Sequence, residues 1–154
     1  MRRSLFAFIA ATAVTVAACS TGASGASAPA GSPAASPVGN GTRIEVKLTD
    51  SLRIEPTAIA VPAGVPVTFV ITNSGGTDHE FYLGDEAAQA EHEKEMVAMG
   101  GMGHDEPEGI AVKPGQTREL TYTFAQSGQT LAGCHVAGHY GAGMKAAITI
   151  TANG

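Results

Sequence analysis

The chain has 154 residues, enough for one ordinary domain or for a smaller domain with attachments. Its formal charge of -5 argues against binding to nucleic-acid phosphates, and its two cysteines exclude both a disulfide-stapled miniprotein and a four-cysteine zinc module. Although 44% of the residues are hydrophobic, only 5% are aromatic, so alanine, which builds a core poorly, supplies much of the apolar content.

Residues 1–18 have the pattern of a secretory signal peptide. Arg2 and Arg3 precede a 14-residue apolar stretch, which is shorter than the roughly 17–25 residues of a membrane-spanning helix. The stretch ends in VAAC at residues 16–19, which resembles the lipobox of bacterial lipoproteins, whose cysteine is acylated and becomes the mature N-terminus. We therefore expect export to the periplasm or the cell exterior and a membrane anchor on Cys19. Cleavage without lipidation, giving a soluble secreted protein, is the alternative.

The next segment reads STGASGASAPAGSPAASPVGNG and carries no charge. Such a composition buries too little apolar surface to offset the entropy of ordering, so residues 19–41 are predicted to be a lipidated cysteine followed by a disordered tether. The 22 residues after Cys19, treated as a flexible coil, span roughly 25 Å. A domain held that far from a membrane suits a protein that meets membrane-bound redox partners.

Residues 42–154 are predicted to form one all-β domain. Apolar and charged residues alternate over 44–48, which is the period of a half-buried strand, and β-branched residues fill 65–73. Turn signals such as Lys113-Pro114-Gly115 separate these runs. Further strands are expected at 59–61, 81–83, 120–124, 128–134 and 147–151. Seven to eight short strands with regular turns are typical of a β-sandwich or barrel.

Residues 85–99 interrupt this pattern with the strong helix formers DEAAQAEHEKEMVAM. Acidic residues lie near the start and Gly100-Gly101 follows the end, so the sequence predicts one helix inserted beside the sheet. Ten of the fourteen acidic residues fall between Asp78 and Glu108, which concentrates the negative charge on this side of the domain.

The sequence CHVAGHYGAGM at residues 134–144 places Cys134, His139 and Met144 at intervals of five. A thiolate, an imidazole and a thioether are ligand types that copper prefers. His79 begins a strand after a Gly-rich loop, at an end of the sandwich from which it can supply a second imidazole. Two histidines and one cysteine with a weak axial methionine form the ligand set of blue-copper electron-transfer sites.

On this C-x4-H-x4-M spacing the domain resembles the cupredoxins, the family of plastocyanin, azurin and rusticyanin, and is closest to rusticyanin-like members. The resemblance covers residues 42–154 and implies a Greek-key β-sandwich with one type 1 copper. The ligands that it implies are His79, Cys134, His139 and Met144. Ala137 stands where a proline is common and Glu80 where an asparagine is common. Both departures leave the ligands intact and affect the hydrogen bonds around them.

Each of these residues also has a structural reading. A single free cysteine is commonly a buried small hydrophobe, and Met144 alone would suit core packing. Their combined spacing and the expected export favour a metal site, because free thiols in oxidising compartments usually pair or bind metal. His135 follows Cys134 in an extended segment, so its side chain should point away from the metal, and we expect it to face solvent.

The helix region raises a second hypothesis. Thioethers and imidazoles spaced along one helix face could gather Cu(I), although methionine at such spacing usually packs against a sheet. The residues of this possible secondary site are His92, Met96, Met99, Met102 and His104.

Three functions therefore stay open at the level of sequence. The leading one is a monomeric electron-transfer protein that cycles Cu(I) and Cu(II), with His139 as the exit of the electron because small residues flank it. The others are an extracytoplasmic copper chaperone or buffer, and a metal-free adhesion or scaffolding sandwich. No position is left for a small-molecule substrate, so no catalytic residue is assigned and an enzyme is not expected.

Overall fold

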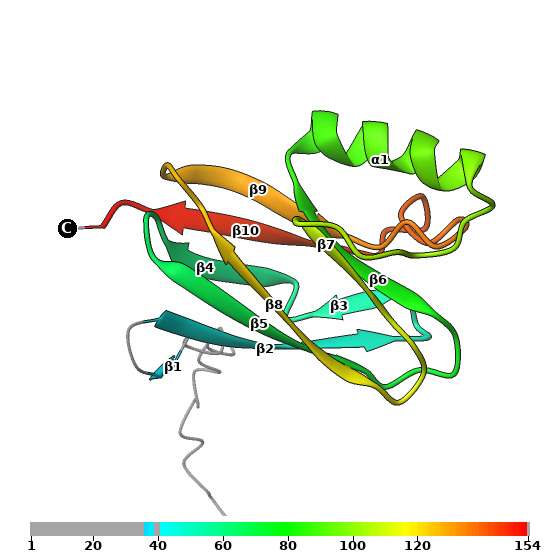
Figure 1. Ribbon diagram of the computed structural model, residues 1–154, viewed down its shortest axis with the longest axis horizontal. Coiled ribbons are helices and arrows are strands. Elements are labelled where there is room, and N and C mark those ends of the chain that lie inside the picture. The colour runs from blue at the N-terminus through cyan, green and yellow to red at the C-terminus, as the bar shows by residue number, and fades with distance from the viewer. Residues whose placement is uncertain (1–35, 39–40, 154) are drawn as a thin grey trace, which may run out of the picture.

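The computed structural model describes residues 36–38 and 41–153. The predicted signal peptide and Cys19 lie outside the described residues. The described part of the chain contains ten strands and one helix (Figure 1). In chain order they are β1 (Ser36–Val38), β2 (Gly41–Thr49), β3 (Arg53–Glu55), β4 (Ala58–Pro62), β5 (Pro66–Asn73), β6 (His79–Gly84), α1 (Glu86–Ala98), β7 (Gly109–Val112), β8 (Thr117–Thr123), β9 (Gly128–Gly133) and β10 (Lys145–Thr151).

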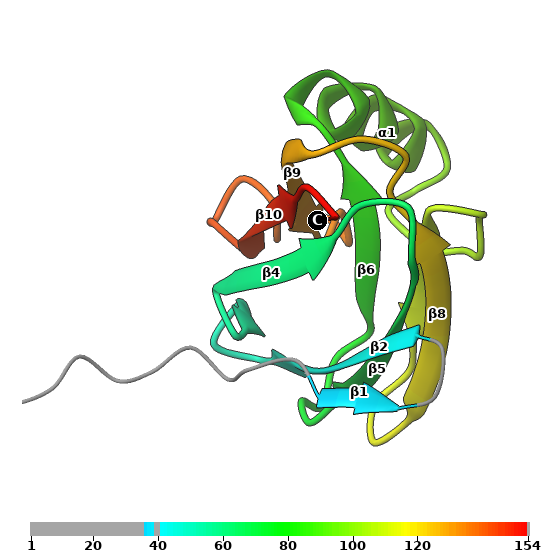
Figure 2. The same cartoon turned by 90° about the vertical axis from the view of Figure 1, so that its left-hand side faces the viewer.

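The strands form two sheets that face each other (Figure 2). One sheet has the order β1-β2-β5-β8, with β3 also paired to β2, and the other has the order β4-β10-β9-β6-β7. The pairs β2–β5 and β4–β10 are parallel, while the remaining pairs are antiparallel. This two-sheet sandwich confirms the predicted fold class.

The core between the sheets follows from alternation along the strands. In β2, Ile44, Val46 and Leu48 are buried while the residues between them face outward, as their period of two predicts. Phe69 of β5 contacts Phe81 of β6 across the two sheets, with ring centroids 5.2 Å apart. Because this core is apolar on both inner faces, it holds the strand ends, and whatever side chains they carry, in fixed positions.

Three strands have no counterpart among the seven runs located from the sequence. Strands β1 and β3 have only three residues each, which is too short for an alternating pattern to be recognised. Strand β7 is buried at three of its four residues, so it does not alternate. Strand β1 pairs with β2 through its main chain, and the segment predicted as a tether therefore includes a short strand near its end.

Helix α1 lies outside the second sheet, close to β6 and β9 (Figure 1). Asp85 caps its first turn by accepting a hydrogen bond from the Ala88 N–H at 2.9 Å, and Met99 is the C-cap. Gly100 and Gly101 follow with φ of 82° and 75°, a conformation that glycine adopts without steric cost. The helix bounds therefore agree with those predicted from its capping and stop signals. Among the described residues, no helix has the length and apolar character needed to span a bilayer.

Candidate metal centre

Three of the four predicted ligands lie on one loop between two paired strands. Cys134 directly follows β9 and Met144 directly precedes β10, and the Cys134 N–H donates to the Met144 carbonyl at 3.2 Å. His79 is the first residue of β6, which pairs with β9. The sandwich therefore brings His79 and Cys134, which are 55 positions apart, to the same end of one sheet.

The loop between Cys134 and Met144 is held by its own main chain. The His139 N–H donates to the Val136 carbonyl at 2.9 Å, and the Met144 N–H donates to the His139 carbonyl at 3.1 Å. Gly138 and Gly143 have φ of 83° and 95°, so glycine permits the two sharp turns on either side of His139. These bonds fix the position of the His139 ring before any ligand binds.

The donor atoms have the spacing of ligands to a single metal ion. The Cys134 Sγ atom lies 3.8 Å from Nδ1 of His79 and 3.5 Å from Nδ1 of His139. Nitrogen and sulfur ligands on bonds of about 2.0 and 2.3 Å, at an angle of about 120°, would be about 3.7 Å apart. Met144 is fully buried directly before β10 and would offer copper a soft thioether sulfur. The residues present therefore fit copper.

Two polar residues hold the ring of His79. Its Nε2 atom lies 3.4 Å from the Thr77 hydroxyl and 3.5 Å from a carboxylate oxygen of Asp50. Hydrogen bonds from the Gly76 N–H and the Thr77 hydroxyl lower the pKa of Asp50 to about 2, so this carboxylate is charged at neutral pH. Contacts at Nε2 leave Nδ1 free to bind a metal. No sequence pattern indicates Asp50, because only the fold brings it to His79.

Burial sets the protonation state of the metal ligands. Burial raises the pKa of the Cys134 thiol to about 11, against the opposing effect of hydrogen bonds from the Glu80 and Val136 N–H groups. Burial also lowers the pKa values of His79 and His139, and for His79 the neighbouring His139 adds to the effect. At neutral pH the metal-free protein therefore holds a thiol and two neutral imidazoles, and a metal that binds Sγ displaces its proton.

Glu80 stands where the resemblance to cupredoxins implies asparagine, and it gives the Cys134 sulfur a hydrogen bond through its main chain. Its main-chain N–H donates to Cys134 Sγ at 3.3 Å, while its fully buried carboxylate turns elsewhere. One carboxylate oxygen lies 3.1 Å from Nε2 of His92 and accepts from the His135 N–H at 3.3 Å. The side chain at this position therefore links the metal loop to helix α1.

The prediction that His135 faces solvent is wrong. Its side chain is 1% exposed, with Nε2 2.6 Å from Oε1 of Gln89 and Nδ1 in contact with Glu93. Its ring also stacks on Tyr140, with centroids 4.4 Å apart. The ring does point away from the copper ligands, but helix α1 covers the face toward which it points.

The methionines of the helix region occupy different environments. Met96 is fully buried, as packing against a sheet predicts, whereas Met99 and Met102 are 47% and 74% exposed. The rings of His92 and His104 lie with centroids 5.6 Å apart, because the chain after α1 turns back beside the helix. The fold thus brings the two histidines together, while the three thioethers differ in their exposure, and Cu(I) binding by this segment stays a prediction.

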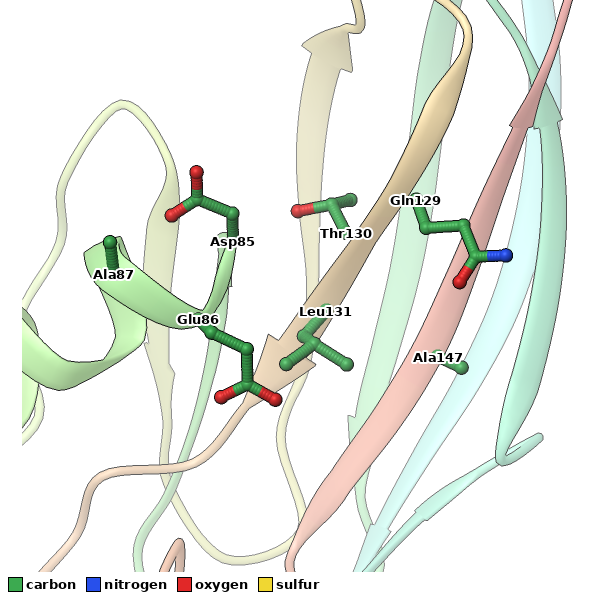
Figure 3. Close-up of a pocket in the computed structure, with 7 residues that line it drawn as sticks. All are labelled: Asp85, Glu86, Ala87, Gln129, Thr130, Leu131 and Ala147. Atoms are coloured by element: carbon green, nitrogen blue, oxygen red, sulfur yellow. The ribbon is translucent and has the colours of Figure 1, made fainter.

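A surface hollow lies near the start of α1 (Figure 3). It is formed between the first turn of α1 and strands β9 and β10, with Glu86, Thr130 and Leu131 among its lining residues. None of its seven lining residues is a histidine, cysteine or methionine. The hollow therefore has no donors of the kind that copper prefers.

Comparison with known proteins identifies the domain. Residues 41–151 match the copper binding proteins of the plastocyanin/azurin family. Three relatives are each named copper-resistant cuproprotein CopI. The Pseudomonas aeruginosa protein is 37% identical over 136 residues, covering 70% of this chain and 75% of its own length. Those of Rubrivivax gelatinosus and Vibrio cholerae are 35% and 33% identical and also match 70% of this chain, which spans slightly under two thirds of their lengths, 65% and 64%.

Solved structures of similar fold include two auracyanins. Reduced auracyanin from Roseiflexus castenholzii has a TM-score of 0.64 at 21% identity, covering 73% of this chain and 99% of its own. Auracyanin B has a TM-score of 0.62 at 22% identity, covering 79% of this chain and 96% of its own. With the ligand geometry, the family match assigns copper to the type 1-like site of His79, Cys134, His139 and Met144. The chain belongs to the plastocyanin/azurin family of copper-binding proteins.

Proposed function

We propose that this protein exchanges single electrons through a type 1 copper that cycles between Cu(I) and Cu(II). The observation that supports this most strongly is the preformed set of one sulfur and two imidazole nitrogens, spaced 3.5 and 3.8 Å from the sulfur. Copper in such a set supplies a one-electron couple, because a plane of two histidines and one cysteine is tolerable to both oxidation states. A ligand set that the fold already holds in place has little to rearrange when the electron moves.

The electron is proposed to leave through His139. This ligand is half-buried, whereas His79, Cys134 and Met144 are buried. The residues around it are small and exposed, namely Gly138, Gly141, Ala142 and Gly143. A partner protein can therefore approach the edge of the His139 ring closely, which shortens the distance over which the electron passes.

Copper handling in resistance is the second candidate, and the relatives favour it. All three are named copper-resistant cuproproteins, at 33–37% identity. A handling role would use the same ligands but release the metal, whereas a carrier keeps its metal and releases an electron. The two roles therefore predict different fates for the bound copper.

One experiment separates the two roles. The copper-loaded protein is cycled electrochemically in the presence of a Cu(I) chelator, and the copper retained per chain is counted after each cycle. An electron carrier gives a reversible one-electron wave and keeps its copper through many cycles. Loss of copper to the chelator on reduction, without a reversible wave, would contradict electron transfer and support copper handling. The Cys134→Ser protein is the control, since it lacks the sulfur ligand.

We further propose that the domain works at the outer side of the cell membrane, tethered through Cys19 and serving membrane-bound redox partners. The signal pattern of residues 1–18 and the VAAC motif support this location. In cell fractionation, the wild-type protein should sediment with membranes and a Cys19→Ala protein should not. Equal release of both proteins into the soluble fraction would overturn the anchor.

A further inference from the structure

A second group of metal-ligand side chains lies at helix α1, outside the type 1 site. Ligand atoms of His92, Glu95 and Glu106 lie within 4.8 Å of one another. Two of these residues come from α1, and Glu106 comes from the chain between α1 and β7. The group is separate in the sequence from His79 and from the Cys134–Met144 loop.

His92 carries an unpartnered nitrogen that points into this group. Its ring is 1% exposed, and Nδ1 has no hydrogen-bond partner among the described residues. The nearest carboxylate oxygens are 3.6 Å away on Glu106 and 3.8 Å away on Glu95, too far for a hydrogen bond. Two nitrogen or oxygen ligands on bonds of about 2.0–2.2 Å are about 3–3.6 Å apart at ordinary coordination angles. The distances from Nδ1 to the two oxygens are therefore closer to the distance between two ligands of one metal ion than to the length of a hydrogen bond.

The surroundings orient His92 as a ligand. Nε2 lies 3.1 Å from the buried carboxylate of Glu80, and a proton on this nitrogen leaves the lone pair of Nδ1 for a metal ion. The ring stacks on Tyr82 with centroids 3.8 Å apart and planes inclined by only 2°. A histidine fixed by a carboxylate on one nitrogen, with the other nitrogen free, is the usual arrangement of a metal-bound imidazole.

The charges at this group favour a cation. Within the described part of the chain, neither Glu95 nor Glu106 forms an ion pair with lysine or arginine. Glu106 instead contacts Nε2 of His104, whose Nδ1 is buried and has no partner in the part of the chain that the structure describes. Two carboxylates that face the same ring nitrogen repel one another, and a cation between them removes this repulsion.

We propose that His92, Glu95 and Glu106 bind a second metal ion, a divalent cation of the copper and zinc class, with His104 orienting Glu106. One imidazole and two carboxylates suit Cu(II) and Zn(II) and do not suit Cu(I), which prefers sulfur. The site shares His92 and His104 with the Cu(I) site considered for this segment, but it uses carboxylates instead of thioethers and therefore suits a different oxidation state. Glu80 connects the two centres, because its N–H donates to Cys134 Sγ and its carboxylate lies against His92.

The test counts Cu(II) bound to four forms of the protein. Wild type, a Glu95→Gln/Glu106→Gln double variant, a Glu91→Gln control and a Cys134→Ser variant are loaded with excess Cu(II) and desalted. Glu95 and Glu91 are largely exposed on α1 and Glu106 is partly exposed, so these substitutions should not unfold the domain, whereas a change at buried His92 could. Copper per chain, the visible thiolate band and the electron paramagnetic resonance spectrum are recorded, and a parallel titration uses Zn(II).

The expected result is two copper ions per chain for wild type and for the Glu91→Gln control. The second copper adds a nitrogen- and oxygen-ligated resonance signal without a thiolate band. The double variant should keep the band and bind the second ion at least tenfold more weakly, a loss of the size seen when metal-site residues are changed. Cys134→Ser should lose the band and keep the second ion, and Zn(II) should compete with Cu(II) for it.

One bound copper per wild-type chain, accompanied by the thiolate band, would overturn the proposal. Second-site binding that is unchanged in the double variant would also overturn it, because the carboxylates would then play no part. A missing thiolate band with the second ion still bound would instead contradict the type 1 assignment alone. The two claims therefore fail separately.

Discussion

At the scale of single residues, the type 1 ligands differ in their burial and in the contacts that hold them. Cys134 is held as a buried thiol whose pKa is raised to about 11, so a metal has to replace its proton. His79 is fixed through Asp50 and Thr77, while His139 has small exposed neighbours. Met144 is buried directly before β10 and would provide only a weak axial donor type. Substitution at Met144 should therefore tune the copper without abolishing its binding.

Met144→Leu replaces the thioether by an apolar group of similar volume. We expect the thiolate band to remain, because Cys134 and both histidines are unchanged. The reduction potential should rise, since loss of a donor disfavours Cu(II) more than Cu(I). Voltammetry of the purified protein measures this, with the exposed Met99→Leu as the control. A lower potential, or loss of the thiolate band, would contradict the role given to Met144.

His135→Ala tests the buried polar contacts beneath α1. The substitution removes the partners of Gln89 and Glu93 and leaves a cavity, which should lower the free energy of unfolding by about 2–4 kcal/mol. Urea unfolding measures the loss, and the visible spectrum of the copper-loaded protein should keep its thiolate band. Replacing a solvent-facing histidine would lower the free energy of unfolding by under about 0.5 kcal/mol, and such a small loss would contradict the buried position of His135.

At the scale of elements, helix α1 is the segment outside the two sheets that most affects the residues next to the metal ligands. It was predictable from the sequence because capping, composition and the glycine stop all agree over residues 85–99. Its effect on His135 was not predictable, because a period-of-two pattern says which side a residue faces but not what covers that side. Likewise, the pairing of His92 with Glu106 depends on how the chain after α1 turns back, and no local pattern encodes that path.

Asp85→Ala removes the N-cap of α1. The Ala88 N–H loses its acceptor, which should lower the free energy of unfolding by about 1 kcal/mol. Asp85→Asn is the matched control and should lower the free energy of unfolding by only about a few tenths of a kcal/mol, because the amide oxygen can also cap the helix. Chemical denaturation of the three proteins checks both values, and equal stability of Ala and Asp forms would contradict the capping role.

At the scale of the whole molecule, the sandwich turns distant parts of the chain into one copper site. The strand pattern and the C-x4-H-x4-M spacing follow from the sequence, because regular alternation and a single ligand loop are local signals. His79 was predicted from its place at the start of a strand after a Gly-rich loop. The short strands β1 and β3 and the support from Asp50 are not local signals, since they depend on main-chain pairing and on loop packing. Copper, which binds only the assembled site, should therefore stabilise the entire fold.

Removal of copper should lower the thermal midpoint without unfolding the protein at room temperature, because the apolar core does not include the metal. A free copper concentration 100 times the dissociation constant adds about 2.7 kcal/mol to the free energy of unfolding. Thermal denaturation with and without a chelator measures the shift. Cys134→Ser should show a much smaller shift, and a midpoint that is independent of copper in the wild-type protein would contradict copper binding to the folded protein.

The most direct test of the type 1 assignment is a Cu(II) titration followed by visible absorption. We predict that the wild-type protein develops an intense copper–thiolate band that saturates at one equivalent of Cu(II), and that the Cys134→Ser protein develops none. A band that persists in Cys134→Ser, or a wild-type protein that binds Cu(II) without any such band, would contradict copper ligation by Cys134.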